Sequence, residues 1–313
     1  MNKRITVIGA GNVGATVADT IAQKDLANEV VIVDVKEGIA EGKALDLWQC
    51  SSVLGFNTKV IGVTNDYEKT KDSSVVIITS GLPRKPGMSR DDLIATNAGI
   101  VKEVAENAVK YSPDAIFIIV TNPLDVMTYA ALKATGLPSK RVFGMAGILD
   151  VARFTAFIAD ELKVSPNSID AMLLGGHGDT MVPLVRYSSV GGTPICDLIP
   201  KERLDQIVER TRKGGGELVK LMGTSAWYAP GYAVGLMVES IIKNQKKIFP
   251  VCAYLDGEFG IKNNFLGVPC KLGTEGIEKI YEIDLNEEEK AMLDTSANHV
   301  KEVMNVLDGM NMF

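Results

Sequence analysis

Residues 5–14 read Ile-Thr-Val-Ile-Gly-Ala-Gly-Asn-Val-Gly, a short apolar run that leads into a G-x-G-x-x-G pattern. The run predicts a buried strand, and residues 15–23 are compatible with a helix. In such a turn the first glycine permits a tight bend, the second lets the backbone approach a pyrophosphate, and the third allows close packing of helix and strand. The N-terminus of the helix then presents free N–H groups to the phosphates. We therefore expect the turn to bind a dinucleotide, with cofactor contacts from Gly9, Ala10, Gly11, Asn12, Val13 and Gly14.

An acidic residue follows this turn at the spacing that dinucleotide-binding proteins use. Asp34 comes 20 residues after Gly14, at the end of the apolar run 31–33. There its carboxylate can accept hydrogen bonds from the ribose hydroxyls of an adenosine group. A carboxylate at this place repels a 2′-phosphate, so NAD is the expected cofactor, although the nearby Lys36 leaves NADP as an alternative. A glycine-rich turn in an unrelated α/β sheet is the weaker interpretation. The glycine motif, the strand and helix around it, and the acidic residue that follows all fit a dinucleotide-binding turn.

The first half of the chain alternates short β-branched runs with helical patterns, which is typical of a parallel sheet covered by crossover helices. We predict buried strands over residues 5–8, 30–33, 75–79 and 116–120. Ser89 is expected to cap a helix whose first turn contains Asp91 and Asp92. The predicted fold class is α/β, a Rossmann-type doubly wound parallel sheet followed by a mixed α+β catalytic domain.

The pattern changes after about Gly147, where longer helices precede strand-like runs. We predict helices over 151–162, 202–222 and 234–244, strands over 251–255 and 264–272, and a last helix that begins near residue 286. The expected domains are an NAD-binding domain over 1–146 and a catalytic, substrate-binding domain over 147–313, with the site between them. Residues 221–238 carry no charge, but they contain glycine and proline, so we expect buried structure there and no membrane span.

Composition disfavours several classes of function. The 313 residues suffice for two domains, and the net charge of −6 disfavours nucleic acid as a partner. Two histidines and four widely spaced cysteines disfavour a metal site, and the thiols are expected to be reduced and mostly structural. The apolar run at the N-terminus is too short for a signal peptide, so we expect a cytoplasmic protein with no membrane association.

Two further stretches carry the residue types of an acid–base site. Asp150 and Arg153 are three residues apart on a predicted helix, so they share one face of it. In residues 174–179, Leu-Gly-Gly-His-Gly-Asp, the glycines expose the imidazole of His177. Oxidation of a secondary alcohol needs a base for the hydroxyl proton, and a guanidinium can hold a carboxylate through two parallel hydrogen bonds. The other histidine, His299, is expected to be an ordinary solvated side chain of the last helix.

With these motifs in place, the chain resembles the lactate and malate dehydrogenase family over essentially its whole length. The matching stretches are GAGNVG at 9–14, VTNP at 120–123, GMAGILDVAR at 144–153 and GGHGD at 175–179. The resemblance implies NAD-dependent hydride transfer, with His177 as the proton acceptor and Asp150 as its orienting partner. It also implies that Arg153 binds the 1-carboxylate and that Asn122 contacts the hydroxyl or carbonyl of the substrate. Further cofactor contacts that it implies are Asn97, Val120, Thr121 and Asn122.

The loop at residues 81–90, Gly-Leu-Pro-Arg-Lys-Pro-Gly-Met-Ser-Arg, is implied to select the substrate. By resemblance, Arg90 polarises the substrate carbonyl. Arg84 occupies a position where lactate dehydrogenases typically carry glutamine and malate dehydrogenases carry arginine. An arginine there provides a partner for a second carboxylate, whereas a three-carbon acid would leave it desolvated and unpaired. The expected reaction is therefore the reversible oxidation of the dicarboxylate malate to oxaloacetate.

Two alternatives stay open at this point. A lactate or broader 2-hydroxyacid dehydrogenase remains, because one residue does not fix specificity alone. A non-catalytic NAD-binding module would have the same fold, although the presence of His177, Asp150, Arg153 and Arg90 argues against it. The resemblance also implies a homo-oligomer, with a tetramer favoured over a dimer.

Overall fold

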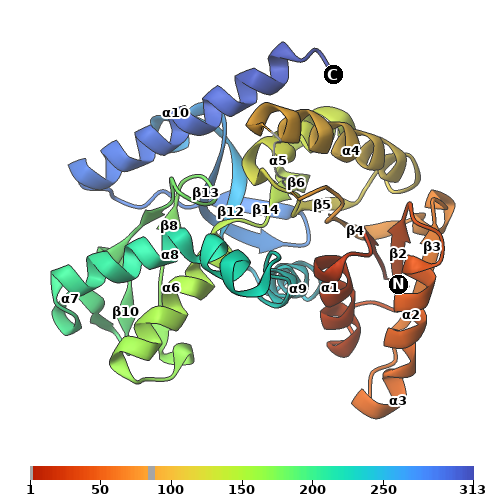
Figure 1. The fold of residues 1–313 in the computed structure, drawn as a ribbon, viewed down its shortest axis with the longest axis horizontal. Helices are drawn as coiled ribbons and strands as arrows, with labels where there is room; N and C mark the ends of the chain where they lie inside the picture. The colour runs from red at the N-terminus through yellow and green to blue at the C-terminus, as the bar shows by residue number, and fades with distance from the viewer. Residues whose placement is uncertain (1–2, 84–88) are drawn as a thin grey trace.

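The computed structural model describes residues 3–83 and 89–313, and its centre is a nine-stranded sheet (Figure 1). The strand order is β14-β13-β12-β6-β5-β4-β1-β2-β3. Six of these strands pair in parallel, namely β1 (Arg4–Ile8), β2 (Glu29–Asp34), β3 (Lys59–Thr64), β4 (Ser73–Ile78), β5 (Ile116–Ile119) and β6 (Val142–Gly144). Their order, 3-2-1-4-5-6, is that of a doubly wound Rossmann sheet, which confirms the predicted fold class.

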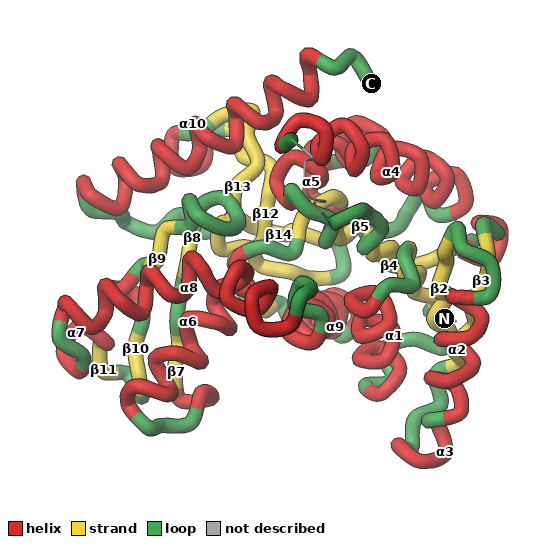
Figure 2. The backbone as a smooth tube through the Cα atoms, in the orientation of Figure 1, coloured by secondary structure: helices red, strands yellow, loops and turns green. Residues whose placement is uncertain are grey.

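Helices cover both faces of the parallel strands (Figure 2). In this half of the chain they are α1 (Asn12–Gln23), α2 (Ile39–Gln49), α4 (Arg90–Tyr111) and α5 (Leu124–Thr135). The short helix α3 (Ser51–Leu54) follows α2 and has no buried residue. The start of α4 is as the sequence predicts. Ser89 Oγ accepts a hydrogen bond from the Asp92 N–H at 3.0 Å, and the Asp92 carboxylate accepts one from the Ser89 N–H at 3.0 Å. This reciprocal capping box fixes where the loop ends and the helix begins.

The second half adds helices and an antiparallel extension of the same sheet. The helices are α6 (Gly147–Leu162), α7 (Ile195–Leu198), α8 (Lys201–Met222), α9 (Tyr228–Ile242) and α10 (Glu287–Gly309). The antiparallel strands β12 (Lys247–Asp256), β13 (Lys262–Gly273) and β14 (Gly276–Ile280) join the parallel ones where Cys252 pairs with Gly144. Short strands form two small sheets, β7 (Ile169–Asp170) with β10 (Ser189–Val190) and β11 (Thr193–Pro194), and β8 (Leu173–Leu174) with β9 (Val182–Pro183).

Two of the predicted helices begin earlier than the sequence pattern indicates. The helix α6 begins at Gly147, before the expected start at residue 151, and α9 begins at Tyr228, before the expected start at 234. In both cases the first turn contains glycine or proline, which blur a helical pattern. The early start of α6 matters for function, because it places Asp150 in the first turn of the helix.

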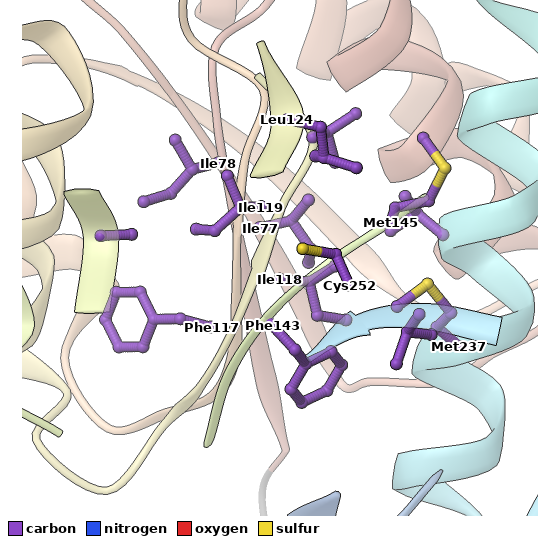
Figure 3. Packing of buried hydrophobic residues seen from close by; sticks show 14 of the residues in the cluster. Ile77, Ile78, Phe117, Ile118, Ile119, Leu124, Phe143, Met145, Met237 and Cys252 are labelled. Carbon is purple, nitrogen blue, oxygen red and sulfur yellow. The ribbon is translucent and has the colours of Figure 1, made fainter. Parts of the chain in front are cut away.

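The buried core runs through both halves of the chain (Figure 3). Ile77 and Ile118 of the parallel strands belong to the same apolar cluster as Met237 of α9 and Cys252 of β12. A second, smaller cluster joins α6 to α8 and the small sheets through Phe154, Ile158, Leu173, Ile195 and Leu204. The two halves therefore share one continuous sheet and one main core.

The uncharged stretch 221–238 is buried only in its second part. Val234 and Met237 of α9 are fully buried, but Leu221 is 74% exposed and Tyr228 is 63% exposed. The expectation that the whole stretch is buried is therefore wrong. The end of α8 and the turn after it lie at the surface, and α9 is mostly buried but exposes Tyr232 and Leu236 on one side. Within residues 3–83 and 89–313, no helix is long and apolar enough to cross a membrane.

Candidate active site

The glycine-rich turn connects β1 to α1 and leaves one side open. Gly9 has a φ of 106°, a conformation that favours glycine, and a Cβ on Gly14 would lie 1.9 Å from the Gly9 carbonyl oxygen. A Cβ on Gly11, in contrast, would have no described atom within 4 Å. Gly11 is the N-cap of α1, and no side chain in the described part of the chain caps this helix. The first N–H groups of α1 are thus available to a phosphate, so the turn fits the pyrophosphate of a dinucleotide.

The predicted ribose partner stands at the end of β2 and is bound to this turn. The Ala10 N–H donates to Asp34 Oδ2 at 2.6 Å, and the Lys36 N–H donates to Asp34 Oδ1 at 2.9 Å. The carboxylate of Asp34 therefore fixes the shape of the turn. Its contact with the adenosine ribose of a dinucleotide stays a prediction.

The structure brings the predicted base, acid and cation together beside the start of α6. His177 Nδ1 lies 2.8 Å from Asp150 Oδ2, and Arg153 Nη1 donates to Asp150 Oδ1 at 3.1 Å. Asp150 is 1% exposed. Because an ionised carboxylate only accepts hydrogen bonds, His177 Nδ1 carries the proton and Nε2 is the free acceptor. This arrangement suits an imidazole that takes a proton from an alcohol.

The hairpin loop between β8 and β9, residues 175–181, holds His177 in place. Gly175, with a φ of 89°, exchanges two backbone hydrogen bonds of 2.9 Å with Gly267 of β13. The His177 N–H donates to Oδ2 of Asp125, on α5, at 3.1 Å. Hydrogen bonds therefore hold the backbone around the imidazole to strand β13 and to helix α5.

Neighbouring carboxyl groups raise the pKa of the His177 imidazole. Burial acts to lower the pKa of His177, but attraction to Asp150, the hydrogen bond to it and attraction to Asp125 together outweigh burial, so the pKa lies above its ordinary value of 6.5. Burial in turn raises the pKa of Asp125. Asp125 was not predicted from the sequence, because an acid in the first turn of a helix is an ordinary stabilising feature.

Two cavities meet at His177. The first has a volume of about 310 Å³ and adjoins the glycine-rich turn. Its apolar wall contains Val13, Val120, Met145, Leu149 and Pro230. The second cavity, of about 470 Å³, includes Arg90, Thr180 and His299 in its lining. Both are lined by Asn122, His177, Gly178 and Asp179. The first cavity thus offers an apolar wall, and its junction with the second cavity offers the polar groups of Asn122 and His177.

The first cavity is also lined by a buried arginine nitrogen and by three residues that were not predicted from the sequence. Arg153 Nε is buried and has no hydrogen-bond partner among the described residues, so a bound carboxylate would satisfy it. Arg212, Ser225 and Ala226 line the same cavity. Arg212 lies in the middle of α8, and Ser225 and Ala226 lie in the turn after this helix. Only the packing of α8 beside α6 brings them to the site.

The loop before α4 is described only in part. Arg84 lies outside the described residues, so its predicted role stays a prediction. Arg90 is the first residue of α4, and its Nη2 lies 2.9 Å from Nε2 of His299 on α10. The expectation that His299 is an ordinary solvated side chain is therefore wrong. Its half-buried ring lines the second cavity because α10 crosses over α4 and α5, an arrangement that no local pattern reveals.

Two of the implied cofactor residues make their hydrogen bonds within the protein. Asn97 is 1% exposed, and its side-chain amide donates to the carbonyl oxygens of Asn122, at 2.7 Å, and Leu82, at 3.1 Å. Its Oδ1 accepts from the Leu82 N–H at 2.8 Å. The hydroxyl of Thr121 donates to the Ser80 carbonyl at 2.6 Å. Both side chains thus hold the backbone around the cavities, and a direct contact with the cofactor stays a prediction.

Comparison with known proteins agrees with this geometry. Residues 3–144 match the sequence model described as lactate/malate dehydrogenase, NAD binding domain, and residues 148–308 match that of the alpha/beta C-terminal domain of the same family. The chain is 63% identical over 307 residues to a malate dehydrogenase of Cytophaga hutchinsonii, and the match covers 98% of each chain.

Solved structures of both kinds of enzyme are similar to this one. A malate dehydrogenase of Salinibacter ruber has a TM-score of 0.95, with 55% identity and 98% of each chain covered. A lactate dehydrogenase of Eimeria maxima with NADH and oxamate also has a TM-score of 0.95, with 42% identity and coverage of 99% of this chain and 96% of that one. The two domain matches together span nearly the whole chain, which therefore belongs to the lactate/malate dehydrogenase family.

Proposed function

We propose that this protein is an NAD-dependent dehydrogenase that interconverts malate and oxaloacetate. The proposal rests on the buried carboxylate of Asp150, which bonds both an imidazole and a guanidinium beside a dinucleotide cradle. Relatives that are 52–63% identical over nearly the whole chain are named malate dehydrogenase. The cofactor is NAD, in agreement with the matched NAD-binding domain and with the carboxylate of Asp34 at the ribose position.

In the proposed mechanism, His177 Nε2 takes the hydroxyl proton of malate, while Asp150 holds the imidazole in the required tautomer and stabilises its charged form. The glycine-rich turn and Asp34 would hold NAD, which would supply the acceptor for the hydride of the substrate carbon. Arg153 holds the 1-carboxylate through paired hydrogen bonds, which keeps the reacting carbon beside His177. Arg90 polarises the carbonyl that forms, and Asn122 makes a polar contact with the same oxygen.

Selection of the four-carbon substrate is assigned to Arg84. A protein with a net charge of −6 needs local positive charge to hold a dicarboxylate, and Arg84 adds a cation to those of Arg90 and Arg153. The alternative, reduction of pyruvate, has support in the similar lactate dehydrogenase structures, at 40% and 42% identity. The arginine at position 84 and the more similar malate dehydrogenases favour the dicarboxylate.

We further propose that the protein acts in the cytoplasm as a homo-oligomer, with a tetramer favoured over a dimer. Apolar side chains are exposed on α3 (Val53, 83%) and at the end of α8 (Leu221, 74%), and a second copy would cover them. Sedimentation equilibrium tests the assembly directly. The division of the chain into an NAD-binding part, 1–146, and a catalytic part, 147–313, belongs to the same proposal.

Replacing Asp34 with serine is expected to narrow the preference for NAD over NADP and to weaken NAD binding. The substitution removes the charge that repels a 2′-phosphate, and it also removes the acceptor that fixes the Ala10 N–H. The measurement is kcat/KM for both cofactors. Asp46→Ser, which removes an exposed carboxylate from α2, serves as the matched control and should leave the ratio unchanged. An unchanged ratio in Asp34→Ser would reject the ribose role.

The pH dependence of malate oxidation is expected to report on the pair of His177 and Asp150. Oxidation needs the neutral imidazole, so activity falls as the pH drops through the pKa of His177, which lies above 6.5. Asp150→Asn removes the charge that stabilises the imidazolium. In a plot of kcat/KM against pH, the acidic limb should therefore move to lower pH. The maximum value of kcat/KM should also fall.

The matched control for this experiment is Asp160→Asn, an exposed carboxylate on the same helix. It should leave the pH profile where it is. A limb that stays in place in Asp150→Asn, or moves to higher pH, would show that Asp150 does not set the protonation of the base.

A further inference from the structure

His299 is the histidine that the proposed mechanism does not use, yet its ring forms part of the cavity that contains His177. Its Nε2 lies 2.9 Å from Arg90 Nη2. We propose that His299 is a positioning residue, which holds the guanidinium of Arg90 at the cavity wall before the substrate binds. This inference rests on the proposed function, because it concerns how Arg90 binds the dicarboxylate substrate.

The helix that carries His299 is fixed to the same hairpin as the catalytic base. Ser296 is buried, and its Oγ accepts a hydrogen bond from the Gly176 N–H at 2.8 Å. Ser296 and His299 are three residues apart on α10, so they share one face of the helix. The carbonyl of Ala297 also accepts from Asn264 Nδ2, on β13, at 2.8 Å. One face of α10 therefore contacts both the hairpin of His177 and the guanidinium of Arg90.

The chemistry of the pair leaves Arg90 free to bind an anion. A guanidinium only donates hydrogen bonds, so His299 accepts at Nε2 and carries its proton on Nδ1. Among the described residues, His299 is the only hydrogen-bond partner of this guanidinium. The bond uses one of five N–H groups, and the remaining ones form the fork that binds a carboxylate or a carbonyl oxygen. Substrate and His299 can thus hold Arg90 at the same time.

The expected consequence is a change in KM with little change in kcat. Without His299, the long exposed side chain of Arg90 samples many rotamers and must be ordered when the substrate binds. That cost applies equally to the bound substrate and to the transition state, so it appears in KM. Ordering one long side chain corresponds to an increase of about 3- to 10-fold.

The test compares His299→Ala, which removes the acceptor, with His299→Gln, whose amide oxygen can still accept from Arg90. We expect His299→Ala to raise the KM for oxaloacetate about 3- to 10-fold, with kcat within about 2-fold. His299→Gln should restore the KM to within about 2-fold of the wild type. Asn298→Ala, on the exposed side of the same helix, is the matched control.

A second readout is the binding of malonate to the enzyme–NADH complex, followed by NADH fluorescence. Malonate is a dicarboxylate with no carbonyl to reduce, so its affinity is measured without turnover. His299→Ala should weaken malonate binding in the wild-type background and have no further effect in an Arg90→Ala background. A double-mutant cycle of this kind isolates the coupling between the two side chains.

Three outcomes would overturn the inference. They are an unchanged KM in His299→Ala, a KM in His299→Gln as high as in His299→Ala, and equal weakening of malonate binding with and without Arg90. The last outcome would mean that His299 contacts the anion itself. Failure of the proposed function is seen separately, because the wild-type protein would then neither oxidise NADH with oxaloacetate nor bind malonate.

Discussion

Replacing His177 with asparagine is expected to lower kcat for malate oxidation by at least ~100-fold and to leave NADH binding nearly intact. The substitution removes the Nε2 acceptor that takes the hydroxyl proton. The glycine-rich turn and Asp34, which bind the cofactor, lie on other elements and keep their contacts. The measurements are kcat at saturating substrate and the Kd of NADH by fluorescence titration.

An unchanged thermal unfolding temperature serves as the control, because it shows that the variant keeps its fold. Turnover close to that of the wild type would reject His177 as the proton acceptor. Equal loss of NADH binding and turnover would instead show that the residue supports the cofactor site, which the geometry does not predict.

Replacing Arg84 with glutamine is expected to change the ratio of activity on oxaloacetate to activity on pyruvate by orders of magnitude. Oxaloacetate loses a charge-assisted partner for its second carboxylate, while pyruvate no longer leaves a guanidinium unpaired. Each effect is worth ~2–4 kcal/mol. Arg153 and the pair of His177 and Asp150 are unchanged, so proton and hydride transfer should survive. The measurement is kcat/KM for both substrates in the wild type and the variant.

Lys85→Gln is the matched control, since it removes one positive charge from the neighbouring position of the same loop. It should leave the substrate ratio close to that of the wild type. If Arg84→Gln keeps the wild-type ratio, or loses both activities equally, Arg84 does not bind the second carboxylate and the choice of malate over lactate loses its support from the loop.

The parallel sheet was predictable from the sequence where its strands are buried on both faces. Residues 30–33 and 75–78 form continuous β-branched runs for this reason. The strand β3 was missed because it lies at the edge of the sheet, where most of its residues are half-buried and Gly62 interrupts the pattern. The strand β6 was missed because it has only 3 residues.

The residues of the candidate site could also be predicted from the sequence only in part. Asp150, Arg153 and His177 could be found because each lies in a short motif with a local signature of glycines or helical spacing. Asp125 and His299 could not, since each resembles an ordinary helical residue. They reach the site only through the packing of α5 and α10 around the hairpin of His177. Residues that act through long-range packing therefore need the structure, whereas those in motifs do not.

The assignment of the substrate is tested by comparing NADH oxidation by the wild-type protein with oxaloacetate and with pyruvate. We expect kcat/KM for oxaloacetate to exceed that for pyruvate by orders of magnitude, because only the dicarboxylate satisfies Arg84 as well as Arg153. Equal activity on both acids, or a preference for pyruvate, would contradict the assignment of malate as the substrate. No oxidation of NADH with either acid would contradict the assignment of the site as catalytic.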